Sequence, residues 1–272
     1  MLELTAEKTQ ALKEFTEENY AQAAFCFRTL LKNKEIKING KKTGENTLVR
    51  AGDRVQYYLT EKQAQKQACT VIYKDENVLI VDKESGVNSE AVFAELQRKH
   101  GKVCRFIHRL DRNTQGLMAF ALGDQAEKAL LCAFREKRVE KIYHALCVGR
   151  FKEKQGTLQA YLKKNEEKAL VKIFDTPVSG GERIVTEYKI LEERESLTKA
   201  EITLHTGKTH QIRAHLAHIG CPILGDMKYG NEAENKRRNV SRQCLVAKRL
   251  SFSLLGELAY LNEKTFISRF EI

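Results

Sequence analysis

Short apolar segments that alternate residue by residue and end at glycine constrain the fold of this chain most strongly. KIYHALCVG (141–149) and KAEITLHTG (199–207) follow this pattern, and VLIVDK (78–83) and LMAFAL (117–122) are shorter apolar runs. Such segments predict β-strands bounded by turns. Many short strands with few helices between them predict an α+β domain built on a mixed, mostly antiparallel sheet.

Helical spacing is clear in one long segment, DQAEKALLCAFREKRV (124–139). Its apolar residues recur at helical intervals, and Asp124 with Glu127 predicts a capping box at its start.

The net charge of +11 is the most informative feature of the composition. An excess of Lys and Arg favours a polyanionic partner, because these side chains displace the counterions condensed on phosphates. On composition alone, the alternative of a basic protein without a polyanionic partner is not excluded. No apolar run approaches the roughly 20 residues of a membrane span, and the N-terminus lacks the pattern of a secretory signal. We therefore expect a cytoplasmic protein that does not enter a membrane.

The seven cysteines are dispersed, and no two form a CxxC pair. An odd, scattered set without an export signal fits reduced thiols better than disulfides or a zinc ribbon. We expect no metal and no cofactor.

The first sixty residues contain the elements of a small unit of their own. The sequence predicts a helix over 20–31, a strand at 36–38 that ends at an Asn39-Gly40 turn, and a second strand over 53–59. This order resembles the RNA-binding domain named after ribosomal protein S-four. The resemblance implies that basic side chains face RNA, namely Arg28, Lys32, Lys34 and Lys37. A basic face that only contacts solvent is the alternative.

The division that follows has three parts. We expect an S-four-like RNA-binding domain at 1–62, a polar linker at 63–69 and a second, larger domain at 70–272.

The segment FIHRLDRNTQGLMAFAL (106–122) places a polar loop between two apolar runs, which is where catalytic groups are usually carried. Nearby Arg109 and Arg112 favour the ionised form of Asp111. An ionised carboxylate suits covalent attack better than general acid catalysis. On charge pattern alone, an ion pair that only fixes the loop stays open.

A second cluster of polar residues lies in LHTGKTHQIRAHLAHIGCPILGDMKYG (204–230). It predicts a helix with Thr209 as N-cap and Gly220 in the C′ position. His210 and Arg213 are three residues apart, on a face that could bind phosphate or pair with a carboxylate of another loop. His215 and His218 are interpreted as polar residues on the surface of this helix.

Together these motifs resemble the RluA family of RNA pseudouridine synthases. HRLDRNTQG is similar to the catalytic motif of that family, KIYHALCVG to its Lys-x-Tyr strand, and GKTHQIRAHLAHIGCPILGD to its late motif. The segments VIYKDENVLIVDKESG and RQCLVAKRLSF also resemble family segments, so the similarity covers about residues 70 to 255. The chain departs from the family pattern at Gln115 and at Glu84-Ser85, and neither departure changes a residue that the resemblance implies to be catalytic.

The resemblance implies a role for individual residues. Asp111 is expected to be the nucleophile, Tyr143 to stack on the uracil, and Arg213 to pair with Asp111. Arg109 is expected to fill the space that a flipped uridine leaves in the RNA helix. The remaining expected RNA contacts are His108, Arg112, Lys208 and His210.

The expected activity is isomerisation of uridine to pseudouridine in structured RNA, with ribosomal RNA favoured over transfer RNA, by a monomeric enzyme. A non-catalytic RNA-binding or ribosome-assembly protein on the same fold is the alternative. A different RNA-modifying enzyme has no motif in its support.

Overall fold

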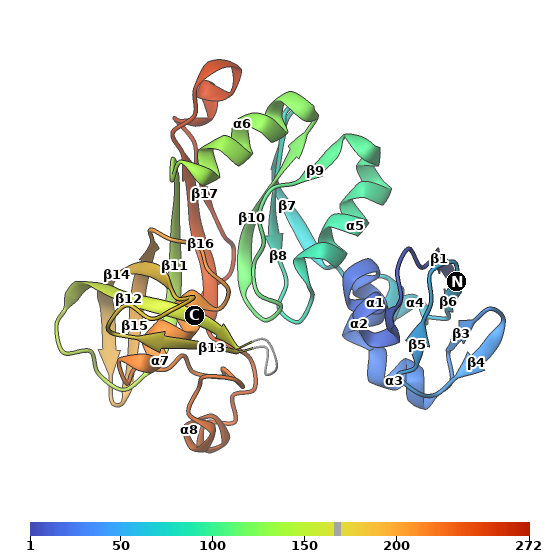
Figure 1. Cartoon of the computed structure of the whole chain (residues 1–272), viewed down its shortest axis with the longest axis horizontal. Helices are drawn as coiled ribbons and strands as arrows, with labels where there is room; N and C mark the ends of the chain where they lie inside the picture. Colours follow the sequence, from blue (N-terminus) through green and yellow to red (C-terminus); the bar gives the residue numbers. More distant parts are fainter. Residues whose placement is uncertain (166–169) are drawn as a thin grey trace.

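The computed structural model describes residues 1–165 and 170–272 and places them around two main sheets (Figure 1). A small four-stranded sheet belongs to the N-terminal residues, and an eleven-stranded sheet carries the rest. The large sheet is mostly antiparallel and is accompanied by a few helices. The α+β prediction with a mostly antiparallel sheet is confirmed.

The N-terminal unit is the blue part of Figure 1. Its sheet has the order β1-β6-β3-β4, and a buried cluster that includes Leu12, Leu30 and Tyr57 forms its core. Its elements are β1 (Leu2–Thr5), β2 (Gln10–Ala11), α1 (Leu12–Asn19), α2 (Ala21–Phe25), α3 (Phe27–Lys32), β3 (Ile36–Ile38), β4 (Lys41–Thr43), β5 (Leu48–Val49) and β6 (Arg54–Tyr57).

Two local expectations for this unit have different outcomes. The turn at Asn39-Gly40 is present, with both residues at positive φ, and it joins β3 to β4. The single helix over 20–31 is wrong: Cys26 leaves the helical conformation and separates α2 from α3.

The segment 63–69, expected as a linker, has structure at both ends. Thr60 caps the one-turn helix α4 (Glu61–Ala64) through a capping box, and Ala68 and Cys69 are buried in the core of the large domain. Ala21 of α2 is buried in that same core, and the Gln22 amide donates to the Glu95 carboxylate at 2.9 Å. The N-terminal unit therefore packs against the rest of the chain.

The large sheet crosses the whole of the second part of the chain. Its strands in spatial order are β13 (Leu170–Phe174), β12 (Gln155–Asn165), β14 (Glu182–Arg194), β15 (Leu197–Leu204), β11 (Val139–Val148), β16 (Leu245–Phe252), β10 (Gln115–Leu122), β8 (Val78–Lys83) and β7 (Cys69–Lys74), with β9 (Cys104–Phe106) beside β10 and β17 (Thr265–Ile267) beside β16. Only β10 and β16 pair in parallel among the described strands.

Two helices cover opposite faces of this sheet near β8 and β10. Alternate residues of β8 point to different cores, so Leu79 packs on the side of α5 (Ser89–His100) and Ile80 on the side of α6 (Asp124–Arg135). Because both faces are covered, β8 is buried along its whole length, which explains its continuous apolar sequence. Two further helices, α7 (Gln211–His218) and α8 (Glu232–Arg237), follow β15.

The expected helix α6 forms, but its capping box does not. Gly123 is the N-cap, and the Asp124 carboxylate binds the guanidinium of Arg105 on β9. The tertiary ion pair replaces the local cap.

Gly116 allows the parallel contact between β10 and β16. Its φ is 112°, and a Cβ at this position would lie 2.3 Å from the carbonyl oxygen of Ala247. Only glycine fits there. The close approach brings the loop before β10 next to β16 and fixes where residues 107–114 emerge from the sheet.

Candidate active site

A cavity of about 470 Å³ opens where the loop before β10 meets β11 and the start of α7. It collects most of the residues expected to act on RNA, from three distant parts of the chain. Its lining includes Asp111, Tyr143, Lys208, His210 and Arg213.

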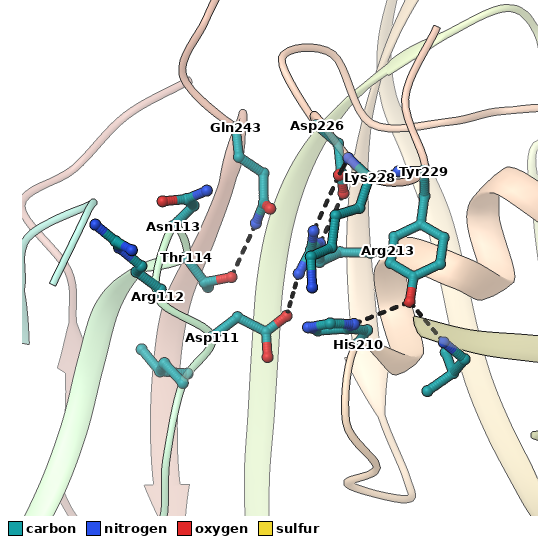
Figure 2. Close-up of polar contacts among 12 residues, drawn as sticks. Asp111, Arg112, Asn113, Thr114, His210, Arg213, Asp226, Lys228, Tyr229 and Gln243 are labelled. Atoms are coloured by element: carbon teal, nitrogen blue, oxygen red, sulfur yellow. Dashed lines mark hydrogen bonds and ion pairs between the residues drawn. The ribbon is translucent and has the colours of Figure 1, made fainter. Parts of the chain in front are cut away.

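Asp111 lies in the loop between β9 and β10 with its side chain at the cavity (Figure 2). Its Oδ2 accepts a hydrogen bond of 2.9 Å from Nη1 of Arg213. Its side chain is 21% exposed, and Oδ1 has no hydrogen-bond partner among the residues that the structure describes. One carboxylate oxygen is thus held, and the other is available to a ligand.

The Arg213 guanidinium is held in place by a second carboxylate, that of Asp226. Nε donates to Oδ2 of Asp226 at 2.7 Å, and Nη2 donates to Oδ1 at 3.0 Å. This bidentate pair uses the planar fork of arginine and leaves Nη1 directed at Asp111. The two carboxylates raise the pKa of Arg213 further above its already high value, against the effect of burial.

Asp226 is fully buried, and the backbone N–H groups of Lys228 and Tyr229 donate to its Oδ1. Burial raises the pKa of the Asp226 carboxyl, but the hydrogen bonds and charge of Arg213, together with these two N–H groups, lower it overall. Sequence reasoning assigned this residue no role. The only signal was its place in the GCPILGD part of the late motif.

The start of α7 differs from the expected one. His210, not Thr209, occupies the N-cap position, with a left-handed φ of 54°, and its Nδ1 lies 2.9 Å from the Tyr229 hydroxyl. This conformation turns the imidazole toward the cavity beside Arg213 (Figure 2). Burial lowers the pKa of His210, so its ring is neutral near pH 7. Gly220 follows the helix in the C′ position at positive φ, as expected.

Tyr143 of β11 forms part of the apolar wall of the cavity, together with Leu204, Ile212 and Leu245. Burial, and then the charge of Asp111, raise the pKa of the Tyr143 phenol well above its usual value. The hydroxyl therefore stays protonated at neutral pH. An aromatic ring in an apolar wall beside a carboxylate fits a planar base.

Lys83, at the end of β8, stabilises the loop that carries Asp111. Its side chain is fully buried, and Nζ donates to the carbonyl oxygens of Glu84, Val87 and Arg112. Burial lowers the pKa of Lys83 to about 7. The three bonds join the loop after β8 to the residue that follows Asp111.

His108 and Arg112 were expected to contact RNA, but they have other partners. The backbone N–H of Ala119 donates to Nε2 of His108, whose ring stacks on Phe134, and burial lowers its pKa to about 3. The His108 imidazole is therefore neutral and fixed in place, so it helps to position the loop and carries no positive charge that could bind a phosphate. Arg112 points away from the cavity (Figure 2) and pairs with Glu17 of α1.

The other basic residues expected to contact RNA are accessible. Arg109 is 69% exposed at the cavity rim and lies 3.2 Å from the Glu90 carboxylate. Lys208 pairs with Glu182 beside the cavity. Arg28, Lys32 and Lys34 are exposed on the N-terminal unit, and Lys37 lies over the Tyr58 ring.

His215 is not the surface residue that the sequence suggested. It is buried against the sheet, its Nδ1 lies 3.0 Å from Oγ1 of Thr186, and burial lowers its pKa to about 4. Within residues 1–165 and 170–272, no group of three His, Cys, Asp or Glu side chains could hold a metal ion, and no helix is long and apolar enough to cross a membrane.

Comparisons with known proteins identify the family of this chain. Residues 68–218 match the model of the family described as RNA pseudouridylate synthase. Ribosomal large subunit pseudouridine synthase C of Vibrio parahaemolyticus is 31% identical over 225 residues, which cover 74% of this chain and 70% of the relative. An uncharacterized RNA pseudouridine synthase of Bacillus subtilis, YhcT, is 29% identical, covering 81% of this chain and 77% of its own.

The fold has solved counterparts as well. Human RNA pseudouridylate synthase domain containing 1 superposes with a TM-score of 0.61 at 26% identity, over 69% of this chain and 81% of that structure. The family match spans more than half of the chain and includes Asp111, Tyr143 and Arg213. The chain therefore belongs to the RluA-type RNA pseudouridylate synthase family and is an RNA pseudouridine synthase.

Proposed function

We propose that this enzyme isomerises specific uridines in large-subunit ribosomal RNA, with Asp111 as the nucleophile and with base flipping as the route of entry. The choice of ribosomal RNA is supported by the relatives named ribosomal large subunit pseudouridine synthase C. The observation that carries the catalytic role is the state of Asp111: Arg213 binds one oxygen, and the other faces the cavity without a partner among the described residues.

The reaction moves one bond and conserves all atoms. The bond between N1 of uracil and C1′ of ribose breaks, the uracil turns, and a bond from C5 to C1′ forms; the proton lost from C5 is balanced by the one gained at N1. Arg213 orients the attacking carboxylate, because Asp226 fixes its guanidinium. Tyr143 supports the plane of the uracil while it turns, and its hydroxyl, which stays protonated, can donate a hydrogen bond to the base.

The test compares pseudouridines in ribosomal and transfer RNA from cells with and without this protein. Loss of a defined pseudouridine in large-subunit RNA, and its formation by the purified enzyme on the unmodified RNA, is the expected outcome. If the pseudouridine positions were the same with and without the protein, while the protein bound RNA tightly, the non-catalytic alternative would be favoured. Loss confined to transfer RNA would replace the substrate part of the proposal only.

Arg109 is proposed to fill the position that the target uridine vacates. Flipping costs a few kcal/mol from a stacked, paired context and much less from an unstacked one. Arg109→Ala is therefore expected to slow single-turnover isomerisation at saturating enzyme far more on a structured RNA than on a short single strand with the same uridine. Glu90→Gln, which removes only the ion-pair partner of Arg109, is the control and is expected to preserve the rates. Equal losses on both RNAs would make Arg109 an ordinary phosphate contact.

The N-terminal unit is proposed to be an S-four-like domain that supplies RNA affinity. Deleting it would expose residues buried against it, so substitutions are the cleaner test. Arg28→Gln with Lys32→Gln removes two exposed charges one turn apart on α3. We expect weaker binding and a slope of log affinity against log salt that is flatter by about 0.7–0.9 for each phosphate that is no longer neutralised.

The matched control for this experiment is Lys8→Gln with Lys13→Gln. These two lysines lie in the same unit but already pair with Glu18 and Glu17. An equal change in slope for both double variants would indicate a general effect of net charge, and no change for either would give the domain another purpose.

A further inference from the structure

A second groove adjoins the active cavity, and no role has been assigned to it. It has a volume of about 320 Å³ and lies at the ends of three neighbouring strands, β11, β15 and β16. Its walls are formed by residues 137–141, 203–205 and 251–253. Lys141 and Leu204 line both the groove and the active cavity, so the two spaces are neighbours.

Three cations at this junction lack a carboxylate partner within the described part of the chain. They are Arg135 and Lys141, which line the active cavity, and Lys137, which lines the groove. Lys141 contacts the Phe134 ring, and Arg135 contacts the Cys132 sulfur. Arg138 of the groove wall differs from these three, because it pairs with the Glu136 carboxylate.

The acidic and neutral groups that face the groove are already engaged. Glu140 accepts a hydrogen bond from Ser251, and His205 lies 2.8 Å from the Glu187 carboxylate. Among the described residues, Glu140 forms no ion pair with Lys137 or Lys141, and His205 uses the Glu187 carboxylate as its own partner. The groove keeps a net positive charge that an anionic ligand would neutralise.

Lys141 is the half-buried member of this set. Burial, and then the nearby charge of Lys137, lower the pKa of its ammonium group, which reflects the cost of holding a cation there without a counterion. Lys141 and Tyr143 are two residues apart on β11, so their side chains leave the same face, about 7 Å apart along the strand. The ammonium group therefore lies beside the place where the uracil stacks.

Lys137 occupies a position that favours glycine. It follows α6 with a left-handed φ of 59°, and the N–H of Arg138 closes the helix end on the carbonyl oxygen of Ala133. Glycine is the usual residue at such a helix end because other residues are strained there. Lys137 is held in this strained conformation, and its ammonium group, unpaired among the described residues, lies at the groove.

We propose that this groove, defined by Lys137 and Lys141 with Arg135 at its junction, binds the phosphodiester backbone of the nucleotide next to the target uridine. The target is one unit of a continuous polymer, so the strand must leave the active cavity beside it. The groove adjoins the cavity through Lys141 and Leu204, and its unpaired cations match a phosphate. The inference depends on RNA being the substrate and names where its flanking backbone lies.

The first test measures binding of a short single-stranded RNA to the full chain carrying Asp111→Asn, so that turnover does not interfere. Lys137→Gln and Lys141→Gln are each expected to weaken binding by roughly three- to tenfold and to flatten the salt dependence by about 0.7. Lys128→Gln, an exposed lysine of α6 that lines neither space, is expected to change neither quantity. Equal changes in all three variants, or none in the two groove variants, would overturn the proposal.

The second test replaces single phosphates of the RNA by uncharged methylphosphonates, on either side of the target uridine. One of the two replacements is expected to weaken binding to the protein that has the native Lys141. The same replacement is expected to change the RNA affinity of the Lys141→Gln variant little further. Full additivity at both positions would show that Lys141 contacts neither phosphate. Both tests measure binding and not turnover, so their outcome does not depend on which RNA is the natural target. If the wild-type enzyme proved inactive on ribosomal RNA, non-additive effects of Lys141→Gln and a phosphate replacement would still support the groove.

Discussion

Asp111→Asn is expected to lower the single-turnover rate of isomerisation by a factor of about 10⁴ or more, while RNA affinity stays nearly unchanged. A carboxamide has almost the shape of the carboxylate, and its oxygen can still accept the hydrogen bond that Nη1 of Arg213 donates at 2.9 Å. It cannot act as the nucleophile. The measurement is pseudouridine formed against time at saturating enzyme, with binding followed in parallel.

The control for this variant is Asp124→Asn, the same chemical change at the exposed start of α6. It is expected to leave the rate unchanged. Measurable multiple turnover by Asp111→Ala, which lacks any oxygen at this position, would contradict the assignment. A variant that loses RNA affinity and rate together would instead make Asp111 a structural residue of the loop.

The strands of the large sheet were predictable because their signals are local. The segments at 78–83, 117–122, 141–149 and 199–207 each show apolar alternation or a short apolar run with a turn beside it. Each corresponds to one strand of the structure, although β15 ends at Leu204, three residues before Gly207. Their order in the sheet is not a local property. The parallel contact of β10 with β16 joins residues about 130 positions apart and depends on the missing side chain of Gly116.

The errors occur where a distant residue replaces a local partner. Asp124 has the spacing of a cap, but Arg105 binds its carboxylate more closely than the helix end does. His215 has the spacing of an exposed helix residue, but β14 covers it through Thr186. The sequence of a helix shows which residues share a face; it does not show how many faces the rest of the protein covers.

The site was predictable only in part, for the same reason. Motif resemblance groups Asp111, Tyr143 and Arg213, and the structure places all three at one cavity. Asp226, His108 and Lys83 act through contacts with backbone groups and charges that no local pattern specifies. A second carboxylate partner of Arg213, such as Asp226, could have been predicted on physical grounds. A buried guanidinium that uses one nitrogen for Asp111 needs another carboxylate for its remaining donors.

Arg213→Ala is expected to lower both the stability and the rate, and Arg213→Lys to separate the two effects. Removing the guanidinium leaves Asp226 fully buried with an unpaired charge, which costs about 3–5 kcal/mol of unfolding free energy. For a chain of this size the melting temperature should fall by about 10 °C. The rate should fall by orders of magnitude, because Asp111 loses the group that orients it.

A lysine at position 213 offers one nitrogen where arginine offers three. Its ammonium group is expected to remain with the more deeply buried Asp226, since that carboxylate has lost the most solvation, and to leave Asp111 without its partner. Arg213→Lys should therefore recover most of the melting temperature but only a small part of the single-turnover rate, measured at a temperature where every variant is folded. If it recovered the full rate while staying destabilised, the contact between Nη1 and Asp111 would be dispensable, and the role of Arg213 would be to neutralise Asp226 alone.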